Sequence, residues 1–182
     1  MKRNTLIITL VILITLSLIG CEKNYKIGDF GPAGGIIFFD KGNKDDGWRY
    51  LEAAPFNHDF ITEWGASGMY VPGTQTGIGT GKRNTEIIVT AINQAGETGR
   101  AAQMCVALNI KGYKDWFLPS KDELNLMYNN LQSHHGSVLA QDGYWTSSQG
   151  NTNNPWYQVF QSGSQFEDGY AIALWVRAVR AF

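Results

Sequence analysis

Residues 116–124 read Trp-Phe-Leu-Pro-Ser-Lys-Asp-Glu-Leu, and this stretch says most about the fold. A short apolar segment ends at Pro119, and Ser120 followed three residues later by Glu123 is a capping box that starts a helix. Apolar residues at helical spacing come next, namely Leu124, Met127, Tyr128 and Leu131. The stretch therefore predicts a strand-to-helix junction, with Glu123 as a first-turn acid that the helix dipole favours.

Other segments predict a mixed fold. Residues 34–40 and 48–54 flank the turn signal Asp46-Gly47 and predict a β-hairpin. A helix is expected from Asn84 or Thr85, because the apolar positions that follow form one stripe, and a second helical stretch runs to about residue 108. Short strands are expected from residue 144 onward, with a last strand within 170–182.

Two later phrases, Tyr-Trp-Thr-Ser-Ser at 144–148 and Val-Arg-Ala-Val-Arg-Ala-Phe at 176–182, complete a pattern with residues 116–124. Together they resemble the C-terminal domain family of the bacterial collagen-like adhesin, which has a C-type-lectin-like fold and also occurs in treponemal variable lipoproteins. The resemblance spans most of the chain after residue 27. It implies an α+β fold of short antiparallel strands and hairpins with two or three helices. It also implies that the N- and C-terminal strands pair, here 36–38 with 176–179, with Phe38 and Val179 buried close together.

The N-terminal residues have the organisation of a bacterial lipoprotein signal. A positive start precedes the apolar run 6–19, which at about 1.5 Å per residue is too short to cross a hydrocarbon core of about 30 Å. Leu18-Ile19-Gly20-Cys21 resembles the lipobox, which implies cleavage before Cys21 and lipidation of its thiol. An ordinary secreted protein is the alternative.

These features divide the chain into a lipoprotein signal peptide (1–20), a lipidated tether (21–28) and a single domain (29–182). The expected location is the bacterial cell envelope, lipid-anchored, at the outer membrane or cell surface. The formal net charge is −1 and no basic block follows the signal, which argues against a nucleic-acid partner.

Catalytic and cofactor motifs are incomplete. The glycine-rich stretch 77–82 lacks the first glycine of a phosphate-binding loop and has Arg83 where Ser or Thr is needed. His134 and His135 are expected in a solvated loop after the helix, with a metal role as the alternative. With Cys21 lipidated, Cys105 stands alone on a helical face and is interpreted as a buried structural thiol. No cofactor or metal is expected, and the chain is expected not to be an enzyme.

The stretch 147–165 carries no charge but many amides, hydroxyls and aromatic rings, a mixture suited to recognition. In retroelement-diversified relatives, substitutions fall in this zone. A lectin-like, adhesin-type surface that binds a protein or glycan is therefore expected, without the carboxylates of calcium-dependent lectins. The alternatives are a structural envelope lipoprotein without a ligand site and, third, an enzyme similar to the sulfatase-modifying enzymes. The candidate ligand-binding residues are Trp145, Ser147, Gln149, Asn151, Asn153, Asn154, Trp156, Tyr157, Gln158, Gln161, Ser164 and Gln165.

Overall fold

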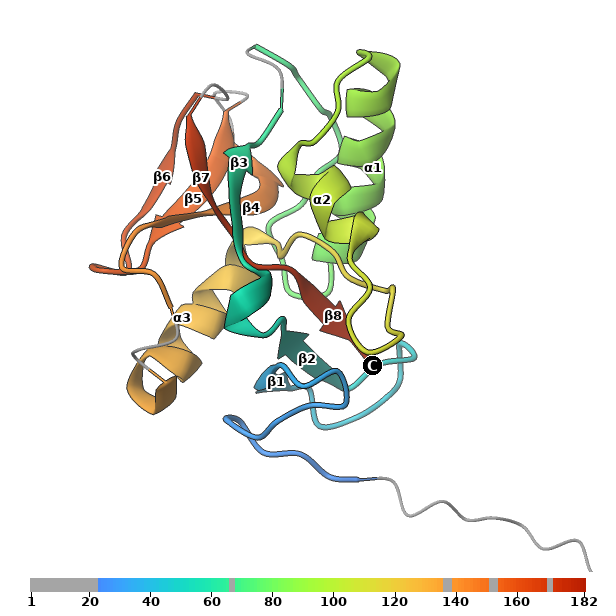
Figure 1. Ribbon diagram of the computed structural model, residues 1–182, viewed down its shortest axis with the longest axis vertical. Coiled ribbons are helices and arrows are strands. Elements are labelled where there is room, and N and C mark those ends of the chain that lie inside the picture. Colours follow the sequence, from blue (N-terminus) through green and yellow to red (C-terminus); the bar gives the residue numbers. More distant parts are fainter. Residues whose placement is uncertain (1–22, 66–67, 136–138, 151–153, 170–171) are drawn as a thin grey trace, which may run out of the picture.

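The computed structural model describes residues 23–65, 68–135, 139–150, 154–169 and 172–182 (Figure 1). Within these residues, three α-helices and two β-sheets form an α+β fold. The helices are α1 (Gly81–Gln94), α2 (Ala101–Ala107) and α3 (Lys121–His135), and a short 3-10 helix, η1, spans Phe56–His58. None of the described helices is both long and apolar enough to span a bilayer.

The smaller sheet has the strand order β1 (Ile36–Asp40), β2 (Tyr50–Ala53), β8 (Val179–Ala181). The larger sheet has the order β3 (Phe60–Glu63), β7 (Ala173–Val176), β4 (Gly143–Gln149), β5 (Pro155–Val159), β6 (Gln165–Glu167). The pairing is antiparallel throughout the described strands except between β4 and β7, which run parallel. The β1–β2 pair is the hairpin that the turn at residues 46–47 predicts.

The expected pairing of the first strand with the last is wrong in its partner. β8 pairs with β2, because residues 28–30 already occupy the other edge of β1. There the backbone N–H of Gly28 donates to the Ile37 carbonyl at 2.8 Å, and the N–H of Ile37 donates to the Asp29 carbonyl at 2.9 Å. Phe38 and Val179 are nevertheless buried in the same core, as expected.

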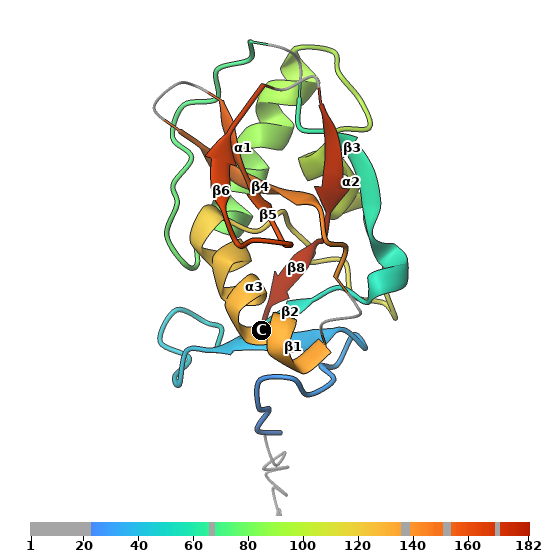
Figure 2. The same cartoon turned by 90° about the vertical axis from the view of Figure 1, so that its left-hand side faces the viewer.

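Residues 173–181 form two strands in different sheets, where the sequence pattern indicates one. The chain leaves the larger sheet after β7, bends at Arg177 and Ala178, and enters the smaller sheet as β8 (Figure 2). At the bend, the buried Arg177 guanidinium pairs with the buried Asp59 carboxylate through contacts of 2.6 and 2.7 Å. A buried ion pair therefore fixes the point where the chain changes sheets.

The predicted start of α3 is confirmed, whereas α1 starts earlier than predicted. Ser120 and Glu123 form the predicted capping box, since the Ser120 N–H donates to the Glu123 carboxylate at 2.7 Å and the Glu123 N–H donates to the Ser120 hydroxyl at 3.2 Å. Helix α1 begins at Gly81, ahead of the predicted caps Asn84 and Thr85, which are buried inside its first turns. Helix α3 continues to His135, so the adjacent histidines belong to the helix and not to the loop after it.

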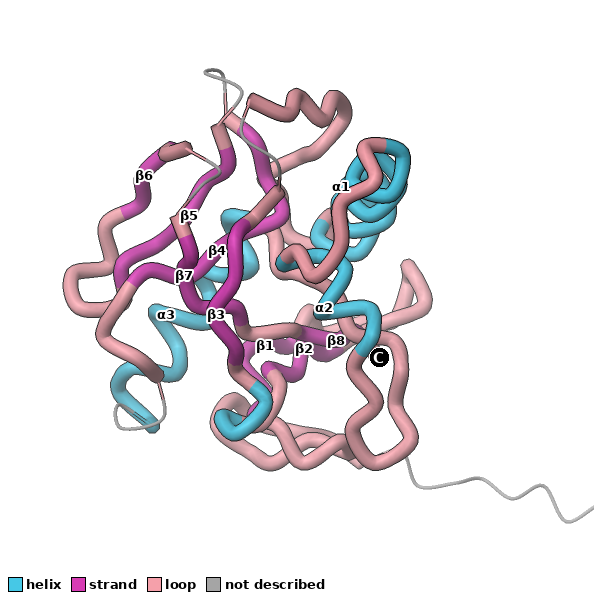
Figure 3. Tube along the Cα trace, turned by 45° about the horizontal axis from the view of Figure 1, so that its top comes forward, coloured by secondary structure: helices cyan, strands magenta, loops and turns pink. Residues whose placement is uncertain are grey.

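Neighbouring residues of β4 point into separate cores. Trp145 is buried in the core formed with α1 and α2, while Tyr144 is buried in the core shared by α3 and the smaller sheet. Figure 3 shows α1 and α2 together beside the larger sheet, with α3 in a separate position. The larger sheet thus separates two hydrophobic cores, and its β5–β6 hairpin extends to one end of the molecule.

Candidate ligand-binding surface

The β4–β5–β6 part of the larger sheet holds most of the residues predicted to bind a ligand. The strand register sorts them onto opposite faces, because residues that pair across antiparallel strands point to the same side. Tyr157 pairs with Trp145 and Phe166, whereas Trp156 pairs with Glu167. Tyr157 and Trp156 therefore lie on opposite faces of the sheet.

Three of the predicted residues, Trp145, Ser147 and Gln158, are fully buried and cannot contact a ligand directly in this structure. Trp145 donates from its indole nitrogen to the Thr62 carbonyl at 3.0 Å, and the Ser147 hydroxyl accepts from Asn84 at 3.2 Å. Gln158 donates to the Asn125 side chain at 2.9 Å and to the Gly163 carbonyl at 3.0 Å. These polar groups are buried because each is hydrogen-bonded.

Gln149 and Asn154 support the loops at the top of β4 and β5. The half-buried Gln149 side chain accepts from the Val71 N–H at 2.7 Å and donates to the Met69 carbonyl at 2.9 Å, so it holds the segment 69–71 in place. The Asn154 carbonyl accepts from the Gly150 N–H at 2.8 Å. Asn151 and Asn153 lie outside the described residues.

Trp156 forms the centre of a polar–aromatic cluster on the face toward α3. The Lys121 ammonium lies 3.5 Å from the centroid of the half-buried indole, within the range of a cation–π contact. Gln165, also half-buried, donates to the Lys121 carbonyl at 3.2 Å. We call Trp156, Lys121 and Gln165 the Trp156 patch. It unites two predicted residues with a lysine that the sequence analysis missed, although Lys121 belongs to the stretch that predicts the α3 capping box.

The opposite face of the hairpin carries a second aromatic pair. The rings of Tyr157 and Phe166 lie 5.6 Å apart, and Phe166 is 47% exposed. Burial raises the pKa of the Tyr157 phenol, and Asp168 adds to this effect. Gln161 and Ser164 are both exposed in the turn between β5 and β6, so the predicted set is not one continuous surface.

A groove away from this hairpin was not predicted. Trp48 lines two adjoining hollows of about 390 and 400 Å³. The Lys41 ammonium lies 4.5 Å from the Trp48 ring centroid, and the backbone of Gly79 passes close to the edge of the indole. The glycine-rich stretch 77–82 marks this groove in the sequence, because Gly79 has a φ of 86° and a side chain there would contact Trp48.

Two groups that could carry chemistry, the Cys105 thiol and the Glu123 carboxylate, are buried. Cys105 is fully buried, and burial raises the pKa of its thiol, so the thiol is protonated and shielded from solvent at neutral pH. Among the described residues, no group of three or more His, Cys, Asp or Glu side chains is placed to hold a metal ion. Glu123, which lines the groove, is buried and engaged by backbone donors.

Comparison with known proteins adds no assignment. A scan of the sequence against protein-family models finds no match, and a search of curated proteins finds no match either.

Proposed function

We propose that the chain is a lipid-anchored protein of the bacterial cell envelope whose C-type-lectin-like domain binds a protein or glycan through the Trp156 patch. The observation that carries this proposal is the Lys121 ammonium held 3.5 Å from the Trp156 ring at a half-buried surface. A planar aromatic ring gives contact area at a low cost in conformational entropy, and neighbouring amides and ammonium groups give directional hydrogen bonds.

The Lys121 ammonium has capacity for a ligand. Within the described part of the chain, it forms no ion pair with a carboxylate, and its contact is with the Trp156 ring. A hydroxyl, carbonyl or carboxylate oxygen of a ligand can therefore accept a hydrogen bond from Lys121 while the apolar part of the ligand packs near the indole. Sugars and peptides both offer this combination.

The position of the hairpin suits display. In Figure 1 and Figure 2, β5 and β6 lie toward the end of the molecule opposite residues 23–35. If Cys21 is lipidated, the anchored end faces the bilayer and β5 and β6 lie toward the opposite end of the molecule. The buried thiol of Cys105 weighs against the alternative of a cysteine-dependent enzyme.

Binding to glycan and envelope-protein arrays tests the proposal. Replacing a packed aromatic anchor typically costs about 2 kcal/mol or more in binding free energy, so Trp156→Ala is expected to weaken binding at least about 30-fold. Lys121→Gln should also weaken binding. Phe166→Ala on the other face and Trp48→Ala in the groove are matched controls, and both should bind as the wild type does, with or without a chelator.

The outcomes separate the candidate surfaces. Loss of binding in Phe166→Ala or Trp48→Ala, with Trp156→Ala unaffected, overturns the assignment of the Trp156 patch. A structural envelope lipoprotein without a ligand site would bind nothing on either array. Lipidation is tested independently, because Cys21→Ala should release the protein from the detergent phase into the aqueous phase. Equal partitioning of the two proteins would contradict the lipid anchor.

A further inference from the structure

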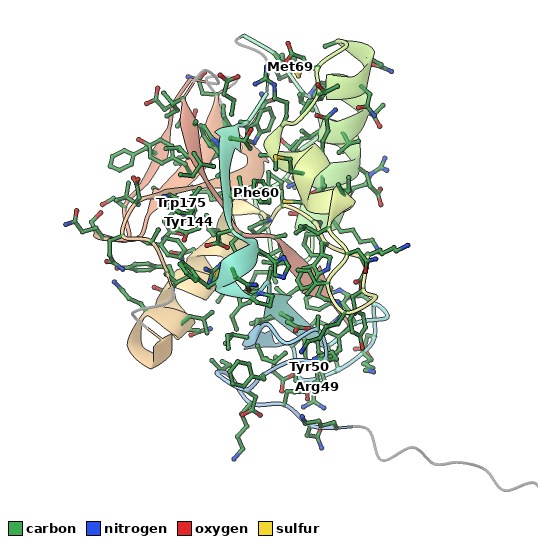
Figure 4. All side chains as sticks on the ribbon, viewed as in Figure 1. Arg49, Tyr50, Phe60, Met69, Tyr144 and Trp175 are labelled. Carbon is green, nitrogen blue, oxygen red and sulfur yellow. The ribbon has the colours of Figure 1, made fainter. Side chains whose placement is uncertain are left out.

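An aromatic pocket lies where the described chain begins. The Tyr25 ring packs edge-on against Tyr50 and Phe182, with ring centroids 5.3 and 5.6 Å away, and the Tyr25 N–H donates to the Tyr50 hydroxyl at 3.2 Å. The hollow beside these rings measures about 320 Å³ and is also lined by Lys23 and Tyr113. Figure 4 shows Tyr50 and Arg49 at this end, next to the segment that carries Tyr25. The first described residues are thus bound to the domain.

Large apolar side chains project from the same segment. Phe30 is 68% exposed and Ile27 is 40% exposed. Their loop is held by the backbone, since Phe30 bridges Ile36 and the Gly31 N–H donates to the Gly35 carbonyl at 2.9 Å. The backbone therefore holds an aromatic and an aliphatic side chain exposed in a fixed loop.

Basic groups lie against the rings of the aromatic pocket. The Lys23 ammonium lies 4.7 Å from the Tyr25 ring centroid, and the Arg49 guanidinium lies 4.9 Å from the Tyr50 ring centroid. Lys26 is an exposed neighbour of Ile27. Tyrosines and cations at the border of an apolar surface are the groups that the headgroup region of a bilayer accommodates.

The length of the tether makes contact with the bilayer unavoidable if Cys21 is acylated. Only residues 22–24 separate Cys21 from Tyr25, so the connection reaches at most about 14 Å even when fully extended. The headgroup layer of each leaflet alone is roughly 5–8 Å deep. The pocket and the Ile27–Phe30 loop therefore remain at the membrane surface.

We propose that Lys23, Lys26, Ile27 and Phe30 form a membrane-docking surface that enters the headgroup region of an anionic phospholipid bilayer, with the pocket of Tyr25, Tyr50 and Phe182 beside it. This inference rests on the lipid anchor of the proposed function. Docking fixes the orientation of the domain, because the lipid chains on Cys21 and the side chains of Ile27 and Phe30 all attach the same end of the domain to the bilayer. The anchored domain then points the β5–β6 hairpin away from the lipid.

The test uses the full-length acylated protein in vesicles of phosphatidylcholine and phosphatidylglycerol. An environment-sensitive dye is attached at Phe30→Cys or, in the matched control, at Phe166→Cys on the β5–β6 hairpin. Cys105 is buried and the Cys21 thiol carries lipid, so each engineered thiol is the labelling site. Headgroup spin-labelled lipid should quench the dye at position 30 several-fold more than the dye at position 166. Ile27→Cys serves as a second reporter and should be quenched as position 30 is.

Each outcome has a definite meaning. Protein that floats with the vesicles but shows equal quenching at positions 27, 30 and 166 overturns the docking surface and leaves the lipid anchor intact. Protein that does not float overturns the anchor and the docking surface together. Changing Lys23 and Lys26 to Gln should reduce quenching at position 30 in the phosphatidylglycerol vesicles. Unchanged quenching would show that the two lysines are not part of the docking surface.

Discussion

The carboxylate of Glu123 accepts a hydrogen bond from the backbone N–H of Gly79, 44 residues earlier in the chain, at 2.8 Å. The same carboxylate accepts from the N–H of Ser120 at 2.7 Å and from that of Gly81. Helix α1 has no acidic residue in its first turn and no side-chain cap from Thr80. Glu123 therefore supplies hydrogen-bond acceptors at the start of α1 as well as the capping box of α3.

Gly81→Ala should destabilise the domain. A Cβ at this position would meet the Glu123 carboxylate and would lie 2.9 Å from both the Ser120 nitrogen and the Phe117 ring. Overpacking of this kind typically costs about 1–3 kcal/mol in the free energy of unfolding, which urea denaturation measures. Gly169→Ala is the matched control, because nothing lies within 4 Å of its added Cβ. Equal unfolding midpoints for the two variants would contradict the shared cap.

Glu123 should also make stability depend on pH. Burial raises the pKa of its carboxyl group above the usual range, although the backbone donors Ser120, Gly79 and Gly81 act in the opposite direction. A raised pKa in the folded state adds stability below the unfolded value of about 4.3, and that contribution is lost as the pH rises through the folded value. The free energy of unfolding of the wild type, relative to Glu123→Gln, should therefore fall as the pH rises above about 4.3. A difference that grows with pH would show that the folded pKa is lowered.

The buried pair of Asp59 and Arg177 should matter far more than an exposed pair. Asp59→Ala removes the carboxylate that pairs with the buried Arg177 guanidinium, and breaking a buried pair typically costs about 3–5 kcal/mol. The Tyr144 hydroxyl also loses its acceptor, since it donates to Asp59 at 3.1 Å. Asp46→Ala is the control: it removes the Lys41–Asp46 pair, in which the Asp46 side chain is 77% exposed, and should cost about 0–1 kcal/mol. If chemical denaturation gave similar losses in the free energy of unfolding for Asp59→Ala and Asp46→Ala, the Asp59–Arg177 pair would not stabilise the bend between β7 and β8.

Deleting Val179–Phe182 should destabilise the whole domain. Val179 exchanges backbone hydrogen bonds of 2.8 and 2.9 Å with Phe117, and the Phe182 carbonyl accepts from the N–H groups of Arg49 and Tyr50. The segment thus joins the smaller sheet to the start of α3. Thermal unfolding followed by near-ultraviolet circular dichroism should show a lower Tm for both cores, and a Tm equal to that of the full chain would contradict the prediction.

Features set by neighbouring residues could be predicted from the sequence. The capping box needs only Ser120 and Glu123, which lie three residues apart, and the first hairpin needs only a turn signal between two apolar runs. The α+β character follows from the same local patterns.

Features set by distant residues could not be predicted. The start of α1 at Gly81 depends on Glu123, which is distant in the sequence. The prediction from Asn84 and Thr85, which used neighbouring residues alone, therefore placed the start too late. The burial of Ser147 and Gln158 depends on Asn84 and Asn125, and the absence of charge alone cannot distinguish a hydrogen-bonded strand from a surface. The partner of β8 depends on residues 28–30, which occupy the competing edge of β1.

The bend between β7 and β8 also sets the order in which the molecule can fold. β7 lies between β3 and β4, and β8 completes the smaller sheet, so both sheets need residues 173–181, which leave the ribosome after every other described strand. Neither sheet can close before translation has passed this segment, because these pairings join residues far apart in the sequence.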